Sequence, residues 1–372
     1  MNALAKVVVL GGGYAGTLAA NHLRTRADVD VTLVNPRPEF VERIRLHELA
    51  AGTRDVAGID FGTILGEGVR LVVDEAIRID APARRVDLAS GAALGYDYLV
   101  HAVGSTAPVP AAAYTVAGIE QARRLRAALA ELPAGAPVTV AGGGPTGIET
   151  AAELAERGRA VTLVTGGTLA PTLSERGRRR VATTLAELGV TVLDDVVVEV
   201  GEDAVVLAGG VRPSAVTVWT AGFAVPQLAA RSGLRTDELG RLLTDETLTS
   251  LDDDRVVAAG DAAAPSGRPL RMSCQTALPL GQHAARTVLS RLAGTEPGTL
   301  DPAYAGTCLS LGRRAGTIQV SRRDDTPTGL VIAGRTAARI KEAVCRGTVW
   351  SVRQGRAVTM KGGRRRAPET VA

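Results

Sequence analysis

The sequence predicts an α/β fold with two similar domains, each built on a parallel sheet, because one pattern occurs twice in the chain. The pattern consists of a short apolar strand, a glycine-rich loop, a helix and a second apolar strand. Its first copy begins at residues 7–10 and its second at residues 138–141, and both second strands contain V-T-L-V. A single G-x-G-x-x-G loop is weak evidence, but two copies in the same context are specific.

The glycines of both loops have the spacing that a dinucleotide pyrophosphate requires. The first glycine allows a tight turn, the second lets the backbone approach the pyrophosphate, and the third lets the helix pack closely on the strand. The N–H groups at the start of the helix then face the anion. The sequence therefore predicts two dinucleotide-binding loops. Their glycines are Gly11, Gly13 and Gly16 in the first loop and Gly142, Gly144 and Gly147 in the second.

The residue after the second strand of such a unit is usually an acid that binds the ribose. Asn35 stands there in the first copy and Thr165 in the second. Both can hydrogen-bond a ribose, but without the charge of a carboxylate. Because a carboxylate favours NAD over NADP, its absence leaves NADH and NADPH open. Arginines 176 and 178–180 follow the second copy, and they are explained more simply as the solvated face of a helix.

Between the two glycine-loop units the sequence predicts several strands and two helices, at residues 40–52 and 119–132. Residues 40–52 have helical spacing and carry Arg43, Arg45 and His47, which by themselves indicate a charged surface helix. A buried strand ends in Gly104, where backbone can again approach a ligand. The strands are expected at residues 69–73, 76–79, 85–88 and 96–104.

Beyond the second loop the sequence predicts a return to the first sheet. A short strand is expected to end at Gly260 and Asp261. The helix that follows it extends to about residue 292 and contains Gln275 near its start. The final part mixes short strands with one further helix. The other elements are expected at residues 174–188, 190–193, 196–200, 204–207, 216–220 and 336–345.

Composition excludes several functional classes. With 372 residues, 45% hydrophobic and 22% charged, the chain has the profile of a globular protein of two or three domains. An aromatic content of 3% leaves little material for stacking bases, so no nucleic-acid partner is expected. Cys274, Cys308 and Cys345 lack metal-ligand spacing, so no metal site is predicted. We recognise neither a signal peptide nor a transmembrane stretch, and we expect a cytoplasmic protein.

The basic residues are concentrated at the C-terminus. Residues 335–372 contain ten Lys/Arg and two Glu, whereas the rest of the chain contains 33 basic and 37 acidic residues. Apolar and basic residues that alternate there could form a peripheral contact with the inner face of a membrane. The alternative is a helix packed on the body followed by a solvated tail, and a homodimer also stays open. The alternating residues are Ile340, Val344, Val349, Trp350 and Val352 with Arg339, Lys341, Arg346 and Arg353.

Five motifs, in this order, resemble those of a known group of flavoproteins. They are the two glycine loops, residues 96–104, V-W-T-A-G at 218–222 and the pair Gly260 and Asp261 before a helix. Together they resemble the FAD-dependent pyridine nucleotide–disulfide oxidoreductase superfamily. H-E-L-A-A-G at residues 47–52 and G-G-G-P-T-G-I-E at 142–149 are similar to motifs of its type II NADH dehydrogenase and apoptosis-inducing-factor-like branch.

The resemblance implies an α/β fold with two Rossmann-like (three-layer ββα) dinucleotide-binding domains, one inserted in the other, plus a small C-terminal α+β region. It assigns residues 1–113 and 223–299 to an FAD-binding domain. Residues 114–222 would form the NAD(P)H-binding domain, and residues 300–372 a C-terminal interface region with the basic tail.

The resemblance also implies the cofactor contacts. The first loop would hold the FAD pyrophosphate, Asn35 would meet the adenosine ribose, and Asp261 would hydrogen-bond the ribityl and phosphate part. The residues implied for FAD are Gly11, Gly13, Tyr14, Ala15, Gly16, Asn35, Arg43, Gly104, Gly260 and Asp261. Those implied for NADH or NADPH are Gly142, Gly144, Pro145, Thr146, Gly147, Glu149 and Thr165.

Four residues are candidates for a catalytic role. Glu149 would lie near the nicotinamide and flavin rings. Arg45 and His47 could stabilise the reduced flavin or relay a proton, and the alternative for both is a surface or inter-domain salt bridge. Gln275 matches one glutamine of the quinone motif A-Q-x-A-x-Q, but Pro279 takes the place of the second.

The implied activity is a flavin relay, in which a hydride passes from NAD(P)H to FAD and electrons then pass to an acceptor. The expected acceptor is a quinone or another small molecule. One alternative is a reductase for a ferredoxin- or rubredoxin-type carrier, and another is a flavoprotein with a binding or signalling role. The helix that carries the redox cysteines in disulfide reductases aligns with residues 40–52, which contain no cysteine. Thiol–disulfide chemistry is therefore not expected.

Overall fold

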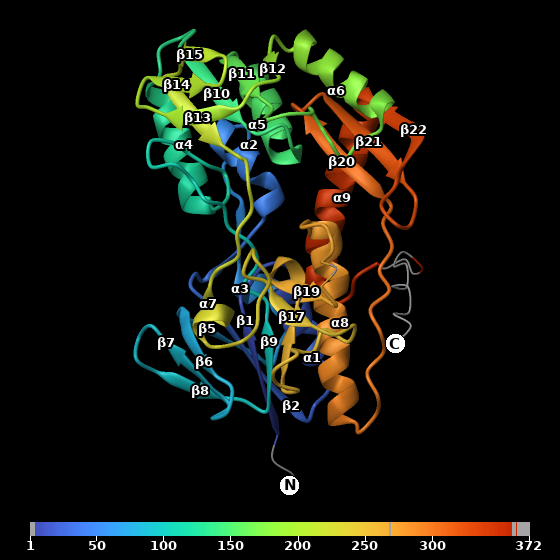
Figure 1. Ribbon diagram of the computed structural model, residues 1–372. Coiled ribbons are helices and arrows are strands. Elements are labelled where there is room, and N and C mark those ends of the chain that lie inside the picture. Colours follow the sequence, from blue (N-terminus) through green and yellow to red (C-terminus); the bar gives the residue numbers. More distant parts are fainter. Residues whose placement is uncertain (1–3, 268, 359–361, 363–372) are drawn as a thin grey trace, which may run out of the picture.

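The computed structural model describes residues 4–267, 269–358 and 362, which form two lobes stacked one above the other (Figure 1). The lower lobe contains the first glycine loop and the upper lobe the second. The helix α9 (Gly334–Gln354) packs on β21 at one end and on α1 at the other, so it connects the two lobes.

The lower lobe is organised around a five-stranded sheet in which every pair of neighbours is parallel. Its strands are rich in Val and Leu and, apart from the edge strand at residues 69–73, mostly buried, as expected for parallel strands covered on both faces. The order across the sheet is β18 (Val256–Ala258), β9 (Tyr98–His101), β1 (Ala5–Leu10), β2 (Val29–Asn35) and β5 (Val69–Val73).

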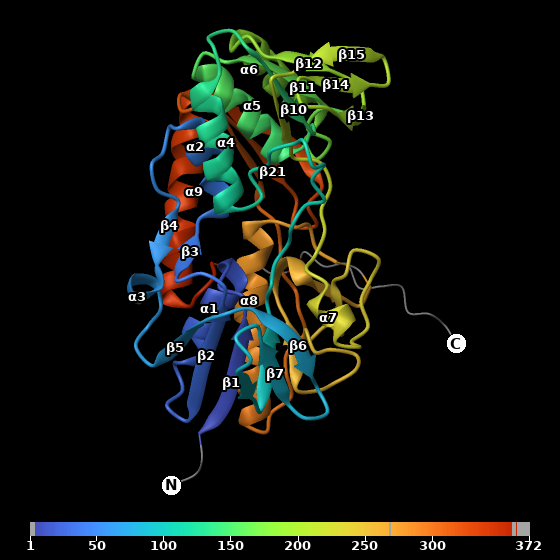
Figure 2. The same ribbon diagram turned by 90° about the vertical axis from the view of Figure 1, so that its left-hand side faces the viewer.

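Both faces of this sheet are covered, as the three-layer prediction requires (Figures 1 and 2). The helices α1 (Tyr14–Leu23) and α8 (Cys274–Leu292) pack together on one face. A three-stranded antiparallel sheet of β6 (Ala76–Asp80), β7 (Arg85–Leu88) and β8 (Ala93–Gly95) lies on the other. The smaller elements are β3 (Glu39–Val41), β4 (Gly58–Asp60), α3 (Phe61–Ile64), α7 (Leu228–Arg231), β17 (Leu242–Thr244), a 3-10 turn (Gly260–Ala262) and β19 (Ala263–Pro265).

The upper lobe repeats this plan with a four-stranded parallel sheet. The strands of this sheet lie in sequence between β9 and β18 of the lower sheet, so the predicted insertion of one unit in the other is confirmed. The order across the sheet is β12 (Thr191–Leu193), β11 (Ala160–Val164), β10 (Pro137–Ala141) and β16 (Val216–Trp219). The remaining elements are α4 (Ile119–Glu131), α5 (Pro145–Glu156), α6 (Glu175–Glu187) and the antiparallel strands β13 (Val197–Val200), β14 (Ala204–Leu207) and β15 (Gly210–Pro213).

The C-terminal region consists of a three-stranded antiparallel sheet and α9. The sheet is formed by β20 (Gly306–Leu311), β21 (Ala315–Ser321) and β22 (Pro327–Ala333). The strand β20 packs on α5 of the upper lobe, and α9 packs on β20 and β21. This region therefore brings α9 close to the second glycine loop.

The single helix predicted over residues 40–52 is wrong in its first half. Phe40 is fully buried in the strand β3, which pairs with β4. A 3-10 turn (Arg43–Arg45) follows, and only α2 (Leu46–Ala51) is α-helical. Gly52 ends α2 in the left-handed conformation, with φ of +74°. The helix α2 contributes to the hydrophobic core of the upper lobe, although its sequence neighbours belong to the lower one.

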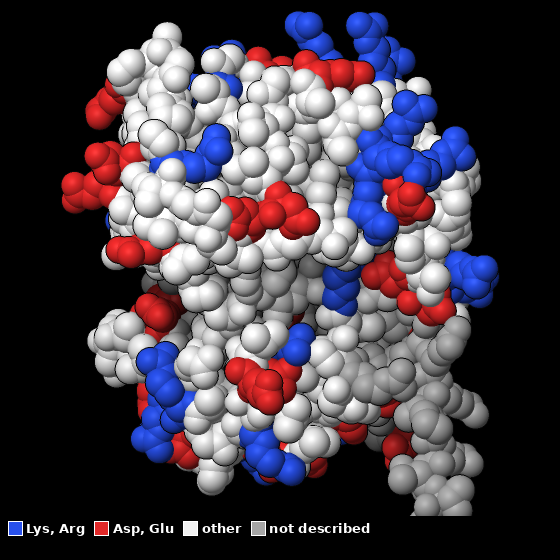
Figure 3. All heavy atoms as spheres, turned by 45° about the horizontal axis from the view of Figure 1, so that its top comes forward, with Lys and Arg blue, Asp and Glu red and all other residues white. Residues whose placement is uncertain are grey.

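Charges of both signs are interspersed over the face shown in Figure 3, with basic side chains grouped on one side of the upper lobe. The surface is hollowed between the two lobes in this view. In the part of the chain that the structure describes, no helix combines the length and the apolar character that crossing a membrane requires. The same residues contain no cluster of His, Cys, Asp and Glu suited to a metal ion.

Candidate active site

The first glycine loop connects β1 to α1, and each of its glycines has a separate structural reason. Gly11 has φ of +98°, and a Cβ there would also collide with the carbonyl oxygen of Ala102. A Cβ on Gly16 would overlap the carbonyl oxygen of Gly11, so this position fixes the contact of helix with loop. Gly13 differs, since a Cβ would meet no atom within 4 Å. Gly11 and Gly16 are therefore required by the geometry of the loop itself, whereas the space beside Gly13 is open.

The second loop, between β10 and α5, repeats all three features. Gly142 has φ of +126°, and a Cβ on Gly147 would overlap the carbonyl oxygen of Gly142. Around Gly144 a Cβ would again meet nothing within 4 Å. Gly13 and Gly144 are the N-cap residues of their helices, and no side chain caps either helix. The free N–H groups and the open space suit a pyrophosphate in both loops.

The residues at the two ribose positions already hold the backbone in place. The Asn35 side chain accepts a hydrogen bond from the Gly12 N–H at 2.8 Å and donates one to the Arg37 carbonyl oxygen at 2.8 Å. The Thr165 carbonyl oxygen accepts from the Gly143 N–H at 3.0 Å. Each residue therefore supports its loop, and the predicted contacts with ribose stay predictions.

Four residues predicted to bind FAD come together at the carboxyl ends of β9 and β18. Arg43 donates to the Ser105 carbonyl oxygen at 2.9 Å, and the Ser105 hydroxyl donates to Asp261 at 2.7 Å. A Cβ on Gly104 would lie 3.7 Å from the Arg43 guanidinium, and one on Gly260 would lie 2.9 Å from Ala15. The predicted set thus converges beside the first loop, and Ser105 is a member that the sequence did not indicate.

The charged side chains of this set are partly buried. Burial raises the pKa of the Asp261 carboxyl above its ordinary value, although the hydrogen bond from Ser105 opposes the change. Burial also lowers the pKa of Arg43, with the nearby Asp261 charge acting in the opposite direction. A polar ligand bound here would give Asp261 and Arg43 hydrogen bonds in place of the water contacts that they lose on burial.

Glu149 lies in the second turn of α5, after the second loop, and is the centre of a buried polar cluster. Its carboxylate accepts a hydrogen bond from the Ser310 N–H at 2.9 Å and lies 3.0 Å from the Lys341 ammonium. The His47 ring lies 3.3 Å from the Ser310 hydroxyl, and Lys341 also donates to the Cys308 carbonyl oxygen at 3.1 Å. The cluster therefore joins α5, α2, β20 and α9.

The electrostatics of this cluster favour an ion pair beside a neutral imidazole. Burial alone would raise the pKa of Glu149, but the Lys341 ammonium and the Ser310 N–H hold it below its ordinary value. Burial alone would lower the pKa of Lys341, but the Glu149 carboxylate holds it above its ordinary value. Burial lowers the pKa of His47 despite the neighbouring carboxylates. At neutral pH the pair is therefore charged and His47 is neutral.

Arg45 lies in a different network from His47. Its buried guanidinium contacts Glu42 at 3.2 Å, Glu48 at 3.1 Å and Glu342 of α9 at 2.9 Å. Arg313 extends this network, because its guanidinium contacts Glu48 at 2.9 Å and Glu153 of α5 at 2.8 Å. Three carboxylates surround the Arg45 side chain, which favours the alternative reading of Arg45 as an inter-domain salt bridge.

Gln275 lies in the first turn of α8, where its side-chain oxygen accepts a hydrogen bond from Arg271 at 3.1 Å. The Arg271 guanidinium also lies 5.3 Å from the Tyr304 ring centroid and forms an ion pair with Asp325 at 3.1 Å. The structure thus connects Gln275 to the C-terminal region. Its predicted role beside the acceptor stays a prediction.

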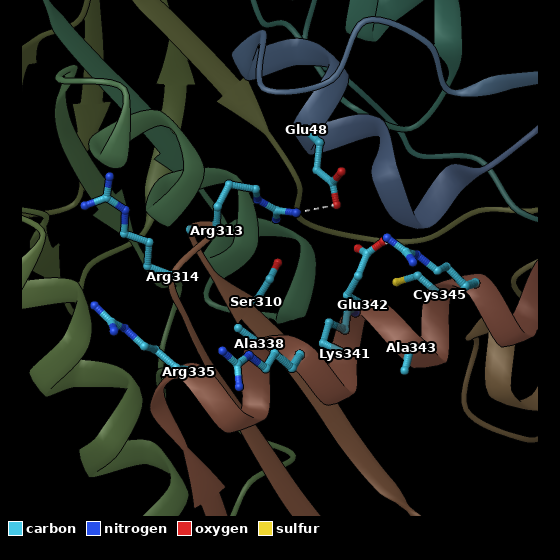
Figure 4. A pocket seen from close by; sticks show the side chains of 13 residues that line it. Glu48, Ser310, Arg313, Arg314, Arg335, Ala338, Lys341, Glu342, Ala343 and Cys345 are labelled. Carbon is cyan, nitrogen blue, oxygen red and sulfur yellow. Dashed lines mark hydrogen bonds and ion pairs between the residues drawn. The ribbon is translucent and has the colours of Figure 1, made fainter.

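A cavity of about 680 Å³ opens beside the Glu149 cluster (Figure 4). Ser310 and Lys341 contribute to its lining, so the cavity connects the cluster to the surface. Figure 4 shows Arg314 and Arg335 side by side at one end and Arg313 turned toward Glu48. The full lining is Glu48, Ser310, Gly312, Arg313, Arg314, Arg335, Ala338, Arg339, Lys341, Glu342, Ala343, Cys345 and Arg346.

Comparison with known proteins assigns the chain to a family. The model of the pyridine nucleotide-disulphide oxidoreductase family matches residues 5–286. The chain belongs to this family. A NADH dehydrogenase-like protein of Mycobacterium tuberculosis is 33% identical over 348 residues, which cover 83% of the chain and 86% of that protein. A type II NADH:quinone oxidoreductase of Staphylococcus haemolyticus is 26% identical, over 91% of the chain and 94% of that protein.

Solved structures of related enzymes share the fold. The type II NADH dehydrogenase of Plasmodium falciparum in complex with NADH superposes with a TM-score of 0.79 at 16% identity, over 94% of the chain and 96% of that structure. The sulfide:quinone oxidoreductase of Aquifex aeolicus superposes with a TM-score of 0.80 at 21% identity, over 95% of the chain and 92% of that structure. As a member of this family, the chain is an FAD-dependent NAD(P)H oxidoreductase. No cysteine occurs in residues 40–52.

Proposed function

We propose that the chain oxidises a reduced nicotinamide and passes the electrons to a quinone. Relatives over nearly the whole length are named type II NADH:quinone oxidoreductases, and this supports the choice of acceptor. The observation that carries the proposal is the buried pair of Glu149 and Lys341 beside a cavity that reaches the surface. Reduction of a quinone takes up protons as well as electrons, so a titratable cluster with access to water is required near the acceptor.

The chain's own residues would position two nucleotides. We assign the first loop to the pyrophosphate of FAD and the second to that of the nicotinamide, since both offer uncapped helix N–H groups and open space at Gly13 and Gly144. Arg43 and Asp261 would hold the flavin side. Bound flavin supplies the hydride-accepting and electron-donating chemistry. Glu149 and Lys341 would hold charge and exchange protons, with His47 and Ser310 linked to them by hydrogen bonds.

This assignment corresponds to a division of the chain. We propose that residues 1–113 and 223–299 form the flavin-binding domain and residues 114–222 the nicotinamide-binding domain. Residues 300–372 would form the interface region, and the packing of β20 on α5 supports a role in closing the site.

Reoxidation of the reduced enzyme tests the acceptor. The enzyme is reduced anaerobically with NADH and mixed in a stopped-flow instrument with a short-chain quinone, a ferredoxin or oxygen. We expect the flavin absorbance to return fastest with the quinone, at a rate that keeps pace with steady-state turnover. Reoxidation by ferredoxin at the turnover rate, with slow reaction of the quinone, would replace the proposal with a carrier-protein reductase.

We also propose that α9 contacts an anionic membrane surface. Ile340, Val344 and Trp350 are exposed on α9, Trp350 to 56%, and Arg339 and Arg346 are exposed near them. Each basic residue at such a surface contributes about 1 kcal/mol of attraction. The set of alternating apolar and basic residues predicted from the sequence for this contact is wrong at two positions, because Val352 is fully buried and Lys341 is paired with Glu149. Most of the basic run at residues 361–366 lies outside the described residues.

Vesicle sedimentation tests this contact with the full chain. We expect the wild type to pellet with vesicles that contain phosphatidylglycerol and to stay in the supernatant with pure phosphatidylcholine. Replacing Ile340, Val344 and Trp350 together by serine should reduce pelleting at least about fivefold, since apolar burial is lost. Equal pelleting of the triple variant and the wild type would contradict a role of α9.

A further inference from the structure

The second glycine unit lacks an acid at the usual ribose position, but the neighbouring strand places one beside it. The strands β11 and β12 are parallel, with Val164 opposite Leu193. Thr165 and Asp194 therefore follow their strands at the same edge of the sheet. The Thr165 hydroxyl lies 3.4 Å from the Asp194 carboxylate. The Thr165 carbonyl oxygen accepts a hydrogen bond from the Gly143 N–H of the second glycine loop. Thr165 therefore contacts both this loop and Asp194.

The Asp194 carboxylate is available as an acceptor. Its residue is exposed, and within the described residues its single hydrogen-bond partner is that Thr165 hydroxyl. The hydroxyl has one proton, and the carbonyl oxygens of Gly167 and Leu193 compete for it. Asp195 differs, because its two oxygens accept from the N–H groups of Val196 at 2.7 Å and Gly209 at 3.2 Å. Asp195 thus holds a turn, whereas Asp194 has acceptor capacity left for a ligand.

The space next to Asp194 is open. Gly166 and Gly167 both have positive φ, +66° and +128°, and a Cβ on either would meet no atom within 4 Å. A ribose bound over the end of β11 would have room above this pair. Two of the four arginines of α6 already have partners of their own, since Arg178 donates to the Leu173 carbonyl oxygen and Arg179 pairs with Glu175.

We propose that Asp194 takes the place of the missing ribose acid and makes the enzyme selective for NADH over NADPH. The carboxylate would accept a hydrogen bond from the adenosine ribose 2′-hydroxyl. A 2′-phosphate at the same place would lose this hydrogen bond and meet a like charge. The inference rests on the proposed assignment of the second loop to the nicotinamide dinucleotide, and it adds the residue that selects between the two forms.

Binding of the oxidised nucleotides tests the inference without turnover. The dissociation constants of NAD⁺ and NADP⁺ are measured by calorimetry on the flavin-loaded wild type and on Asp194→Asn. We expect the wild type to bind NAD⁺ at least about tenfold more tightly. The Asp194→Asn variant should lower the ratio of the two affinities by about tenfold to a hundredfold, the range of one hydrogen bond to a charged group plus the lost repulsion. Equal melting temperatures would show that the exposed substitution leaves the fold intact.

Glu199→Gln is the matched control, because it removes the same charge from an exposed residue of the neighbouring strand β13. Its affinity ratio should equal that of the wild type. Wild-type binding of NADP⁺ as tight as NAD⁺, or a ratio in Asp194→Asn within twofold of the wild type, would overturn the inference while leaving the loop assignment in place. Failure of both nucleotides to bind a yellow wild type would instead refute the loop assignment and the inference with it.

Discussion

Replacing Gly144 by valine is expected to abolish reduction by the nicotinamide while the protein stays folded and yellow. The backbone of Gly144 is extended, with φ of −81°, and a Cβ there meets no protein atom within 4 Å. Valine therefore fits the empty protein and occupies the space assigned to the pyrophosphate. Affinity should fall about a hundredfold or more, because losing two hydrogen bonds to a charged group removes at least about 3 kcal/mol. Stopped-flow reduction by NADH measures the effect.

The companion variant Gly13→Val separates the two loops. Its position is equally open, so it should fold but lose bound flavin during purification. Gly329→Val is the control, since this glycine of β22 also faces open space and lies in neither loop. It should retain both the flavin and its reduction. Normal reduction of Gly144→Val by NADH would contradict the assignment of the second loop.

Replacing Lys341 by methionine is expected to destabilise the protein by about 3–5 kcal/mol at pH 7, because it leaves the buried Glu149 carboxylate without its partner. The side chains of Glu149 and Lys341 are only 10% and 16% exposed. The free energy of unfolding from denaturant titration measures the loss. The pKa of Glu149 should rise when the ammonium is removed, so the folded state then binds a proton more readily than the unfolded state. The deficit should therefore shrink as the pH falls toward 5.

The double variant Glu149→Gln with Lys341→Met provides the control for this pair. It contains no uncompensated buried charge, so it should be more stable than Lys341→Met alone. If Lys341→Met lost less than about 1 kcal/mol, or if the double variant lost the sum of both single effects, the buried ion pair would be refuted.

The glycine loops and both parallel sheets could be predicted because their signals are local. Glycine spacing and apolar runs of four to six residues record the turn, the helix contact and the burial of a strand directly in the sequence. The duplication added certainty, since the second copy reproduces the strand order and the loop geometry of the first. The family resemblance, and not a local pattern, supplied the predicted flavin contacts of Gly104, Gly260 and Asp261, and the structure places all three just after strands of one parallel sheet.

Other features depend on contacts between distant parts of the chain. Phe40 has helical spacing with its successors, but its pairing with Ile59 in β4 determines a strand. The sequence pattern predicts that the last helix ends at Cys345, whereas α9 continues through Gly347 to Gln354 because its buried face packs on α1. Neither the partnership of Lys341 with Glu149 nor the role of Ser310 has a sequence signal, since no motif links these positions. Tertiary packing decides such cases over local propensity.

We propose above all that two loops of the same design hold a flavin and a nicotinamide so that a hydride can pass between them. The most direct measurement is an anaerobic titration of the purified holoenzyme with NADH, followed through the flavin absorbance. We expect stoichiometric bleaching that persists until a quinone is added and is absent in Gly144→Val. A protein that remains colourless after reconstitution with FAD, or one that stays yellow with excess NADH and NADPH, would contradict it.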